Sequence, residues 1–150
     1  MTWNIYLSGE IHTAWREKIE AGLKAVDLPV NLSTSITDNA SSDDCGDRLL
    51  GAEDHSFWKD HKASKINSIR IRNLIEKADV VIVRFGEKYK QWNAAFDAGY
   101  AAALGRSIIL LHDPELTHAL KEADDAVTAV AQTPEEVVNI MKYATNGTSP

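Results

Sequence analysis

The chain has a single cysteine, Cys45, so no disulfide bond can form within it. Cys45 lies in a polar stretch without a basic neighbour before Arg48 that would stabilise a thiolate, and we expect an inert surface thiol. No apolar run is long enough to span a bilayer. The first residues also lack the basic and apolar segments of a signal peptide, which predicts a cytoplasmic protein with no membrane partner.

Basic residues are too few for general affinity to nucleic acid. Sixteen Lys and Arg stand against twenty-two Asp and Glu, giving a net charge of −6. Neutralising a phosphate backbone requires clustered basic side chains, so we expect no polymeric nucleic acid as a partner. A local site for a small anion remains compatible with this composition.

Motifs for cofactors and metals are missing as well. The sequence contains neither of the glycine-rich patterns that bind dinucleotides or nucleoside triphosphates, and no serine nucleophile elbow. Four residues, Glu10, His12, His55 and His61, offer ligand chemistry, but their spacing fits no standard metal site. We therefore predict no cofactor and no metal.

What is present is the pattern of an α/β protein. Hydrophobic residues make up 44% of 150 residues and charged residues 25%, which suits one globular domain. Apolar β-rich runs alternate with helical patterns, and this predicts a flavodoxin-like three-layer sandwich whose parallel sheet has five strands in the order 2-1-3-4-5. The expected strands are 3–8, 29–36, 78–85, 107–111 and 126–131; the expected helices are 13–26, 61–77, 93–104, 116–123 and 134–143. We assign 1–145 to the domain and 146–150 to a tail.

The segment 37–60 interrupts this alternation. It holds seven acidic residues together with Ser41, Ser42, Gly46 and Gly51. A connection of this length within a compact domain is usually functional or partly disordered. We expect a lid with a short helical turn.

Asp97 is the strongest candidate for a catalytic group. It is the only charged residue between Gln91 and Gly105, on a helix apolar enough to be buried, where a carboxylate is costly unless it is paired. If Asn93 is the N-cap, Asp97 lies near the first turn, and the helix dipole and desolvation then act on its pKa in opposite directions. The structural alternative is an ion pair with Arg84 or with another buried basic residue.

Ligands of such a sheet bind beyond the carboxyl ends of the strands, here next to the loops 8–12 and 86–92. Glu10 and His12 follow the first strand and are candidates for proton transfer, or they form a polar turn that caps the next helix. Tyr6, Trp15 and Trp92 are able to stack on a base, or they belong to the core. Asn67 and Arg70 share one helix face and are expected to face the crevice.

Three segments resemble the nucleoside 2-deoxyribosyltransferases and the related deoxynucleotide N-glycosidases. They are Tyr6-Leu7-Ser8-Gly9-Glu10, Ala78-Asp79-Val80-Val81, and the run from Asp97 to Ser107. Within that group, two segments are similar specifically to the YtoQ family: Gly9-Glu10-Ile11-His12 with the following Trp15-Arg16, and the run from Gln91 to Gly99. The resemblance to the YtoQ family covers nearly the whole chain.

The resemblance implies that Asp97 occupies the position of the glutamate that attacks the anomeric carbon of deoxyribose. The base then leaves, and water or a second base resolves the glycosyl intermediate. The substrate is accordingly a small nucleoside or nucleotide, and the related enzymes are commonly homo-oligomers, so we expect one here. The resemblance and the position at the crevice together suggest substrate-binding roles for Tyr6, Gly9, Asn67, Arg70, Trp92 and Asn93.

Two departures from the family pattern leave the function open. Asp97 is one methylene shorter than the usual glutamate, and Ile71 stands where the enzymes carry an aspartate that contacts the base. Arg70 and Arg72 beside it are either phosphate ligands or solvated charges. The chain is therefore an enzyme of the N-glycosidic bond or, alternatively, a non-catalytic nucleotide- or sugar-binding module on the same fold.

Overall fold

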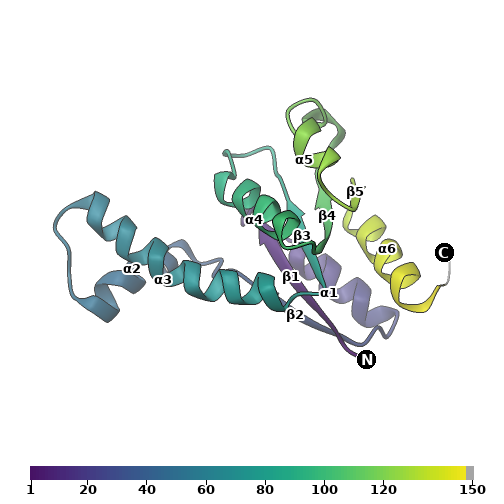
Figure 1. The fold of residues 1–150 in the computed structure, drawn as a ribbon, viewed down its shortest axis with the longest axis horizontal. Helices are drawn as coiled ribbons and strands as arrows, with labels where there is room; N and C mark the ends of the chain where they lie inside the picture. The colour runs from purple at the N-terminus through teal and green to yellow at the C-terminus, as the bar shows by residue number, and fades with distance from the viewer. Residues whose placement is uncertain (148–150) are drawn as a thin grey trace.

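Five short strands pair side by side as a parallel sheet in the order β2-β1-β3-β4-β5 (Figure 1). The computed structural model describes residues 1–147, and the strands are β1 (Trp3–Gly9), β2 (Val30–Thr34), β3 (Val80–Arg84), β4 (Ser107–Leu111) and β5 (Ala129–Ala131). The predicted fold class and strand order are confirmed. At the carboxyl end of the sheet Ser8 lies beside Val83 and Gly9 beside Arg84.

Helices cover both faces of this sheet (Figure 1). They are α1 (Trp15–Ala25), α2 (Asn39–Leu50), α3 (Ser56–Lys77), α4 (Trp92–Ala103), α5 (Lys121–Asp125) and α6 (Pro134–Asn146), with a 3₁₀ turn at Pro114–Leu116. The core falls into two clusters, one with side chains of α1 and α6 against the sheet and one with side chains of α3 and α4. In the described residues, no helix is both long and apolar enough to cross a membrane.

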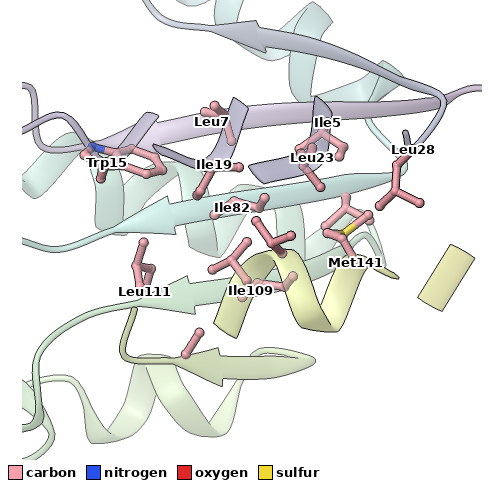
Figure 2. Close-up of a cluster of buried hydrophobic side chains, with 14 residues drawn as sticks. Ile5, Leu7, Trp15, Ile19, Leu23, Leu28, Ile82, Ile109, Leu111 and Met141 are labelled. Carbon is pink, nitrogen blue, oxygen red and sulfur yellow. The ribbon is translucent and has the colours of Figure 1, made fainter. Parts of the chain in front are cut away.

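The alternation of side chains along the strands divides the core between the two faces. On β3, Val80 and Ile82 belong to the cluster under α1 and α6, while Val81 and Val83 belong to the opposite cluster. Figure 2 shows Ile82 beneath Ile19 of α1. Because both faces are covered, β3 is apolar from Val80 to Val83, and each fully buried side chain of this size contributes about 1.5–3 kcal/mol to stability.

The segment expected to be a lid is largely helical. Asp38 caps α2 by accepting a hydrogen bond from the Ser41 amide at 3.1 Å, and α3 begins at Ser56, before the predicted start. The two helices pack together closely at Gly46, since a Cβ there would lie 2.6 Å from the Cβ of Lys62. In Figure 1 this pair extends beyond the sheet, and we call α2 with the first half of α3 the arm.

Cys45 lies within the arm and is buried, so the prediction of a surface thiol is wrong. Its side chain is buried and its Sγ lies 3.8 Å from the carbonyl oxygen of Ala63 on α3. The local sequence is polar because only one face of the amphipathic helix α2 packs on α3, and Cys45 lies on that face.

Other boundaries differ by a few residues. The expected helix 116–123 is a 3₁₀ turn followed by the short α5, and β5 begins three residues later than predicted. α4 begins at Trp92 with Gln91 at the N-cap position, so the predicted cap at Asn93 is wrong. The predicted tail starts inside α6, and its residues 148–150 lie outside the described chain.

A substitution at Gly9 tests whether β1 and β3 approach each other as closely as the structure shows. Its φ is +121°, and a Cβ built there would lie 2.0 Å from the carbonyl oxygen of Arg84. Gly9→Ala should therefore lower the free energy of unfolding by more than about 2 kcal/mol. Gly99→Ala is the matched control, because a Cβ at this position of α4 meets nothing within 4 Å and should stabilise the helix by about 0.5–1 kcal/mol. Chemical denaturation measures both, and an unaffected Gly9→Ala protein would contradict the strand geometry.

Candidate active site

The carboxylate of Asp97 is carried into the interior by α4. Alanines at positions 94, 98 and 101 pack the same helix face against the sheet, and Asp97 is 7% exposed. Its Oδ2 accepts a hydrogen bond from the Ser8 hydroxyl of β1 at 2.7 Å. The alternative pairing with Arg84 does not occur, because Arg84 instead forms an ion pair with Glu10.

Burial determines the protonation behaviour of Asp97. Desolvation raises the pKa of its carboxyl group above the ordinary range, and the hydrogen bond from Ser8 offsets only part of this increase. Because α4 begins at Trp92, Asp97 lies in the second turn, where the helix dipole has little effect. The net direction, which was open from the sequence, is upward.

A cavity of about 490 Å³ opens beside Asp97 between α3 and α4. Among the described residues that line it, Asp97 is the only acid. Asn67 and Ile71 contribute from α3, and Phe96 and Tyr100 from α4, with their rings stacked at 6.5 Å between centroids. This volume falls within the usual range of binding pockets and suits a ligand of nucleoside size.

Three of the predicted site residues meet in this cavity, namely Asp97, Asn67 and Asn93. The Asn67 amide donates to the carbonyl and hydroxyl oxygens of Ser42, both at 3.1 Å, so this side chain also holds α2 on α3. Tyr6 lies fully buried on the same face of the sheet, and within residues 1–147 its hydroxyl has no partner at hydrogen-bond distance. Burial, and after it the nearby charge of Asp97, raises the pKa of the Tyr6 hydroxyl well above its usual range.

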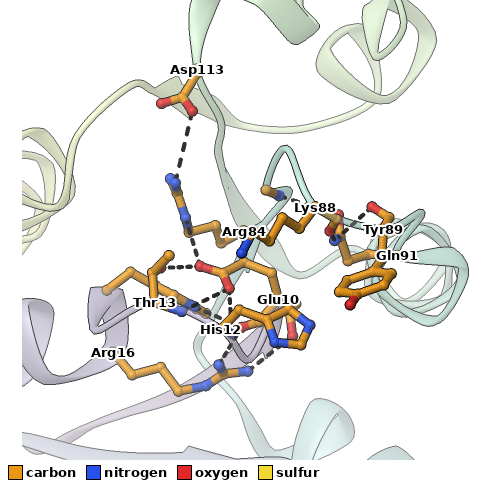
Figure 3. Close-up of polar contacts among 12 residues, drawn as sticks. Glu10, His12, Thr13, Arg16, Arg84, Lys88, Tyr89, Gln91 and Asp113 are labelled. Atoms are coloured by element: carbon orange, nitrogen blue, oxygen red, sulfur yellow. Dashed lines mark hydrogen bonds and ion pairs between the residues drawn. The ribbon is translucent and has the colours of Figure 1, made fainter.

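Glu10 and His12 lie in a different hollow, together with Arg84 and Asp113. Figure 3 shows the Glu10 carboxylate turned back over its own loop, where it accepts hydrogen bonds from the amides of His12 at 2.6 Å and Thr13 at 3.1 Å and from the hydroxyl of Thr13. The His12 ring packs on Tyr89, with 4.9 Å between centroids. These contacts are those of a polar turn that precedes α1.

Glu10 also joins three elements at the carboxyl end of the sheet. Its carboxylate accepts from Arg84 Nε at 3.2 Å, and its carbonyl oxygen accepts from Trp15 Nε1 at 2.9 Å and from Arg16 Nη1 at 2.6 Å. Burial alone would raise the pKa of the Glu10 carboxyl, but the hydrogen bonds from Thr13, His12 and Arg84 outweigh it and hold the pKa below the ordinary range.

The remaining predicted residues lie apart from Asp97. Arg70 donates to the carbonyl oxygen of Thr34 at 2.9 Å and lines a hollow between β2 and α1. Trp92 is 72% exposed at the start of α4 and lines an apolar cleft with Leu116 and Leu120. Gly9 allows the two strands to approach and does not line the cavity at Asp97.

Sequence reasoning missed Ser8 and the pair Phe96 and Tyr100. Ser8 was recognisable in principle, since side chains two residues apart on a strand share a face and Tyr6 was already a candidate. Phe96 precedes Asp97 directly and Tyr100 follows one turn later, which is the spacing of neighbours on one helix surface.

The four histidine and glutamate side chains considered as metal ligands do not gather. His55 accepts a hydrogen bond from the Phe57 amide at 3.2 Å and caps α3, while the His61 ring stacks on Phe57. Within residues 1–147, no three His, Cys, Asp or Glu side chains lie close enough together to hold a metal ion.

The role of Glu10 predicts how Glu10→Gln behaves. A carboxyl whose pKa is lowered by folding stabilises the protein above its ordinary pKa of about 4.3, and this contribution is lost as the pH falls through the lower folded value. Glu10→Gln should cost about 2 kcal/mol at pH 7, with the difference from wild type narrowing toward pH 3. Urea denaturation at several pH values measures it. The exposed Glu17→Gln on α1 is the control, and an equally small effect of both substitutions would contradict this role.

Asp97 should show the opposite pH dependence. Because folding raises the pKa of its carboxyl, stability falls as the pH rises from the ordinary aspartate pKa of about 3.9 through the folded value. Asp97→Asn removes the buried charge while keeping an oxygen for Ser8, so its melting temperature should exceed that of wild type at pH 7–8 by a few degrees. The difference should vanish at acid pH. A less stable variant at pH 7–8 would mean that the carboxylate serves the fold.

Solved structures similar to this chain define the class of fold. A 2-deoxyribosyltransferase from Bacillus psychrosaccharolyticus has a TM-score of 0.57 at 18% identity, over 91% of this chain and 90% of that one. A conserved protein from Enterococcus faecalis V583 has a TM-score of 0.67 at 13% identity, over 96% and 99%. A CMP N-glycosidase from Clostridium botulinum has a TM-score of 0.50 at 15% identity, over 94% and 98%. The chain thus has the fold of enzymes that act on N-glycosidic bonds.

Sequence comparison then gives the family. The model described as nucleoside 2-deoxyribosyltransferase YtoQ matches residues 6–145, and the chain belongs to this family. The YtoQ protein of Bacillus subtilis (strain 168) is 39% identical over 143 residues, which is 95% of this chain and 97% of that protein. The predicted resemblance is confirmed.

Proposed function

We propose that this protein breaks the N-glycosidic bond of deoxynucleosides or deoxynucleotides, with Asp97 as the nucleophile. The observation that carries this proposal is a buried carboxylate at the side of a cavity large enough for a nucleoside, with a single neutral hydrogen-bond partner among the described residues. Such a charge costs stability, and a costly unpaired acid in a cavity is typical of a catalytic site.

The carboxylate geometry suits a displacement at carbon. Ser8 occupies Oδ2, and among the described residues no hydrogen bond engages Oδ1. Oδ1 attacks the anomeric carbon as the bond to the base breaks, and the base departs with the electron pair and takes a proton from solvent. A glycosyl ester on Asp97 results, which water hydrolyses or a second base displaces.

The cavity walls support a nucleoside-like substrate. Phe96 and Tyr100 present aromatic rings beside Asp97, and aromatic stacking tolerates different bases. The departing base meets Ile71 in place of the acid found in the related enzymes, so substrate selection rests on other contacts.

A second candidate function follows from that same position. With Ile71 in the wall and no second acid among the described lining residues, no side chain carboxyl protonates the leaving base. A module that binds a nucleotide or sugar without turnover would have this arrangement. Base release from a suitable substrate distinguishes the two candidates.

The test incubates the protein with deoxynucleosides and their monophosphates, with and without a second free base. Chromatography measures the free base that is released. Wild type should release base, and Asp97→Ala and Asp97→Asn should lower the rate at least about 1000-fold, because the nucleophile is lost. Asp125→Asn, an exposed acid on α5, should leave the rate unchanged. Only the ionised carboxylate attacks, so the rate should fall as Asp97 becomes protonated. Because burial raises the pKa of Asp97, this loss of activity should begin at a higher pH than it would for an exposed aspartate.

Binding without base release from any substrate would reject the enzyme and support the module. Base release that persists in both Asp97 variants would reject Asp97 as the nucleophile. Dependence of the rate on the second base separates transfer from hydrolysis.

A further inference from the structure

Two cations of α3 line the cavity beside Asp97. Lys65 and Arg72 are seven residues apart, which is two helical turns or about 10 Å along the axis, and Ser68 lies between them on the same face. All three side chains line the cavity. The wall opposite α4 therefore carries two positive charges with a hydroxyl group between them.

Lys65 and Arg72 differ from Lys59 and Lys62, the two lysines that precede them on the same helix. On the arm, Lys59 pairs with Asp44 at 2.8 Å and Lys62 pairs with Glu53. Among the described residues, no ion pair includes Lys65 or Arg72. Lys65 and Arg72 thus line the cavity without a partner acid among the described residues.

The guanidinium of Arg72 contacts an aromatic ring and forms no ion pair with a carboxylate of the described residues. Its guanidinium carbon lies 5.9 Å from the centre of the Tyr100 ring, and the Tyr100 hydroxyl donates to Glu76 at 2.6 Å. Glu76 is therefore engaged by the phenol, and the donor groups of Arg72 stay available to a ligand. In a chain of net charge −6, two cations without a paired acid at one cavity indicate an anionic ligand.

We propose that the substrate carries a phosphate ester on its sugar, and that Lys65 and Arg72 bind this phosphate with Ser68 between them. This inference rests on the proposed function, because it places the anomeric carbon at Asp97 and the phosphate against α3. Deoxynucleoside 5′-monophosphates are then the substrate class and unphosphorylated nucleosides are poor ligands. Arginine and lysine both donate charge-assisted hydrogen bonds to phosphate oxygens.

The experiment measures dissociation constants by calorimetry for the deoxynucleosides, their 5′-monophosphates, deoxyribose 5-phosphate and inorganic phosphate. Asp97→Asn protein is used so that binding is measured without turnover. The monophosphate of at least one base should bind about 10- to 100-fold more tightly than its nucleoside, and the preference should shrink with added salt.

The double substitution Lys65→Gln/Arg72→Gln in that background should abolish the preference and leave nucleoside binding within about two-fold. Lys77→Gln, an exposed lysine of the same helix outside the cavity, is the matched control and should keep the preference. Lys65→Arg retains the positive charge and should also retain the preference for the monophosphate. Both substituted residues are exposed on α3, and the melting temperature of each variant verifies folding.

Three results would overturn the inference: equal binding of nucleosides and monophosphates, no binding of either, or a preference that survives the double substitution. Binding of inorganic phosphate or deoxyribose 5-phosphate as tight as that of the nucleotide would also overturn it, because the site would then recognise the free anion. Asp97-dependent base release without a phosphate preference rejects this inference alone. Tight nucleotide binding without base release rejects the proposed function alone.

Discussion

The close approach of β1 and β3 at their carboxyl ends is the constraint on which the rest of the site depends. The amide of Glu10 donates to the carbonyl oxygen of Arg84 at 3.1 Å, and Gly9 has no side chain to prevent this contact. Gly86 meets the other side of Glu10, where a Cβ would lie 2.9 Å from its Cγ. This junction sets the position of Ser8 on β1 and the path of the chain from β3 to α4, and the two meet at Asp97.

Two buried carboxylates near this junction have opposite electrostatic environments. Glu10 is surrounded by donors that hold the pKa of its carboxyl low, and it stabilises the turn before α1. Asp97 has one neutral donor, and burial raises the pKa of its carboxyl. Donors compensate the charge of Glu10, which stabilises the fold, and leave the charge of Asp97 largely uncompensated, which is why we propose Asp97 as the nucleophile.

The long helix α3 divides its charges in a similar way. Lys59 pairs with Asp44 of α2 and Lys62 pairs with Glu53 of the loop between the two helices, whereas Lys65 and Arg72 farther along line the cavity. The same helix therefore packs against α2 and also forms a wall of the candidate active site.

The sequence by itself determined the alternation of strands and helices, the family and the isolation of Asp97, because strand patterning, short motifs and a lone acid are local features of the chain. The strand order was predicted from the usual topology of such α/β folds, and the structure confirms it. Only the tertiary structure decided which partners these residues have. Glu10 and His12 follow β1 as expected, yet the turn directs them into another hollow, and the partner of Asp97 is Ser8, 89 positions away in the chain. The helix α2 escaped prediction because its apolar face is defined only by packing against α3. Contacts between distant segments depend on how whole elements pack, and no local pattern encodes that geometry.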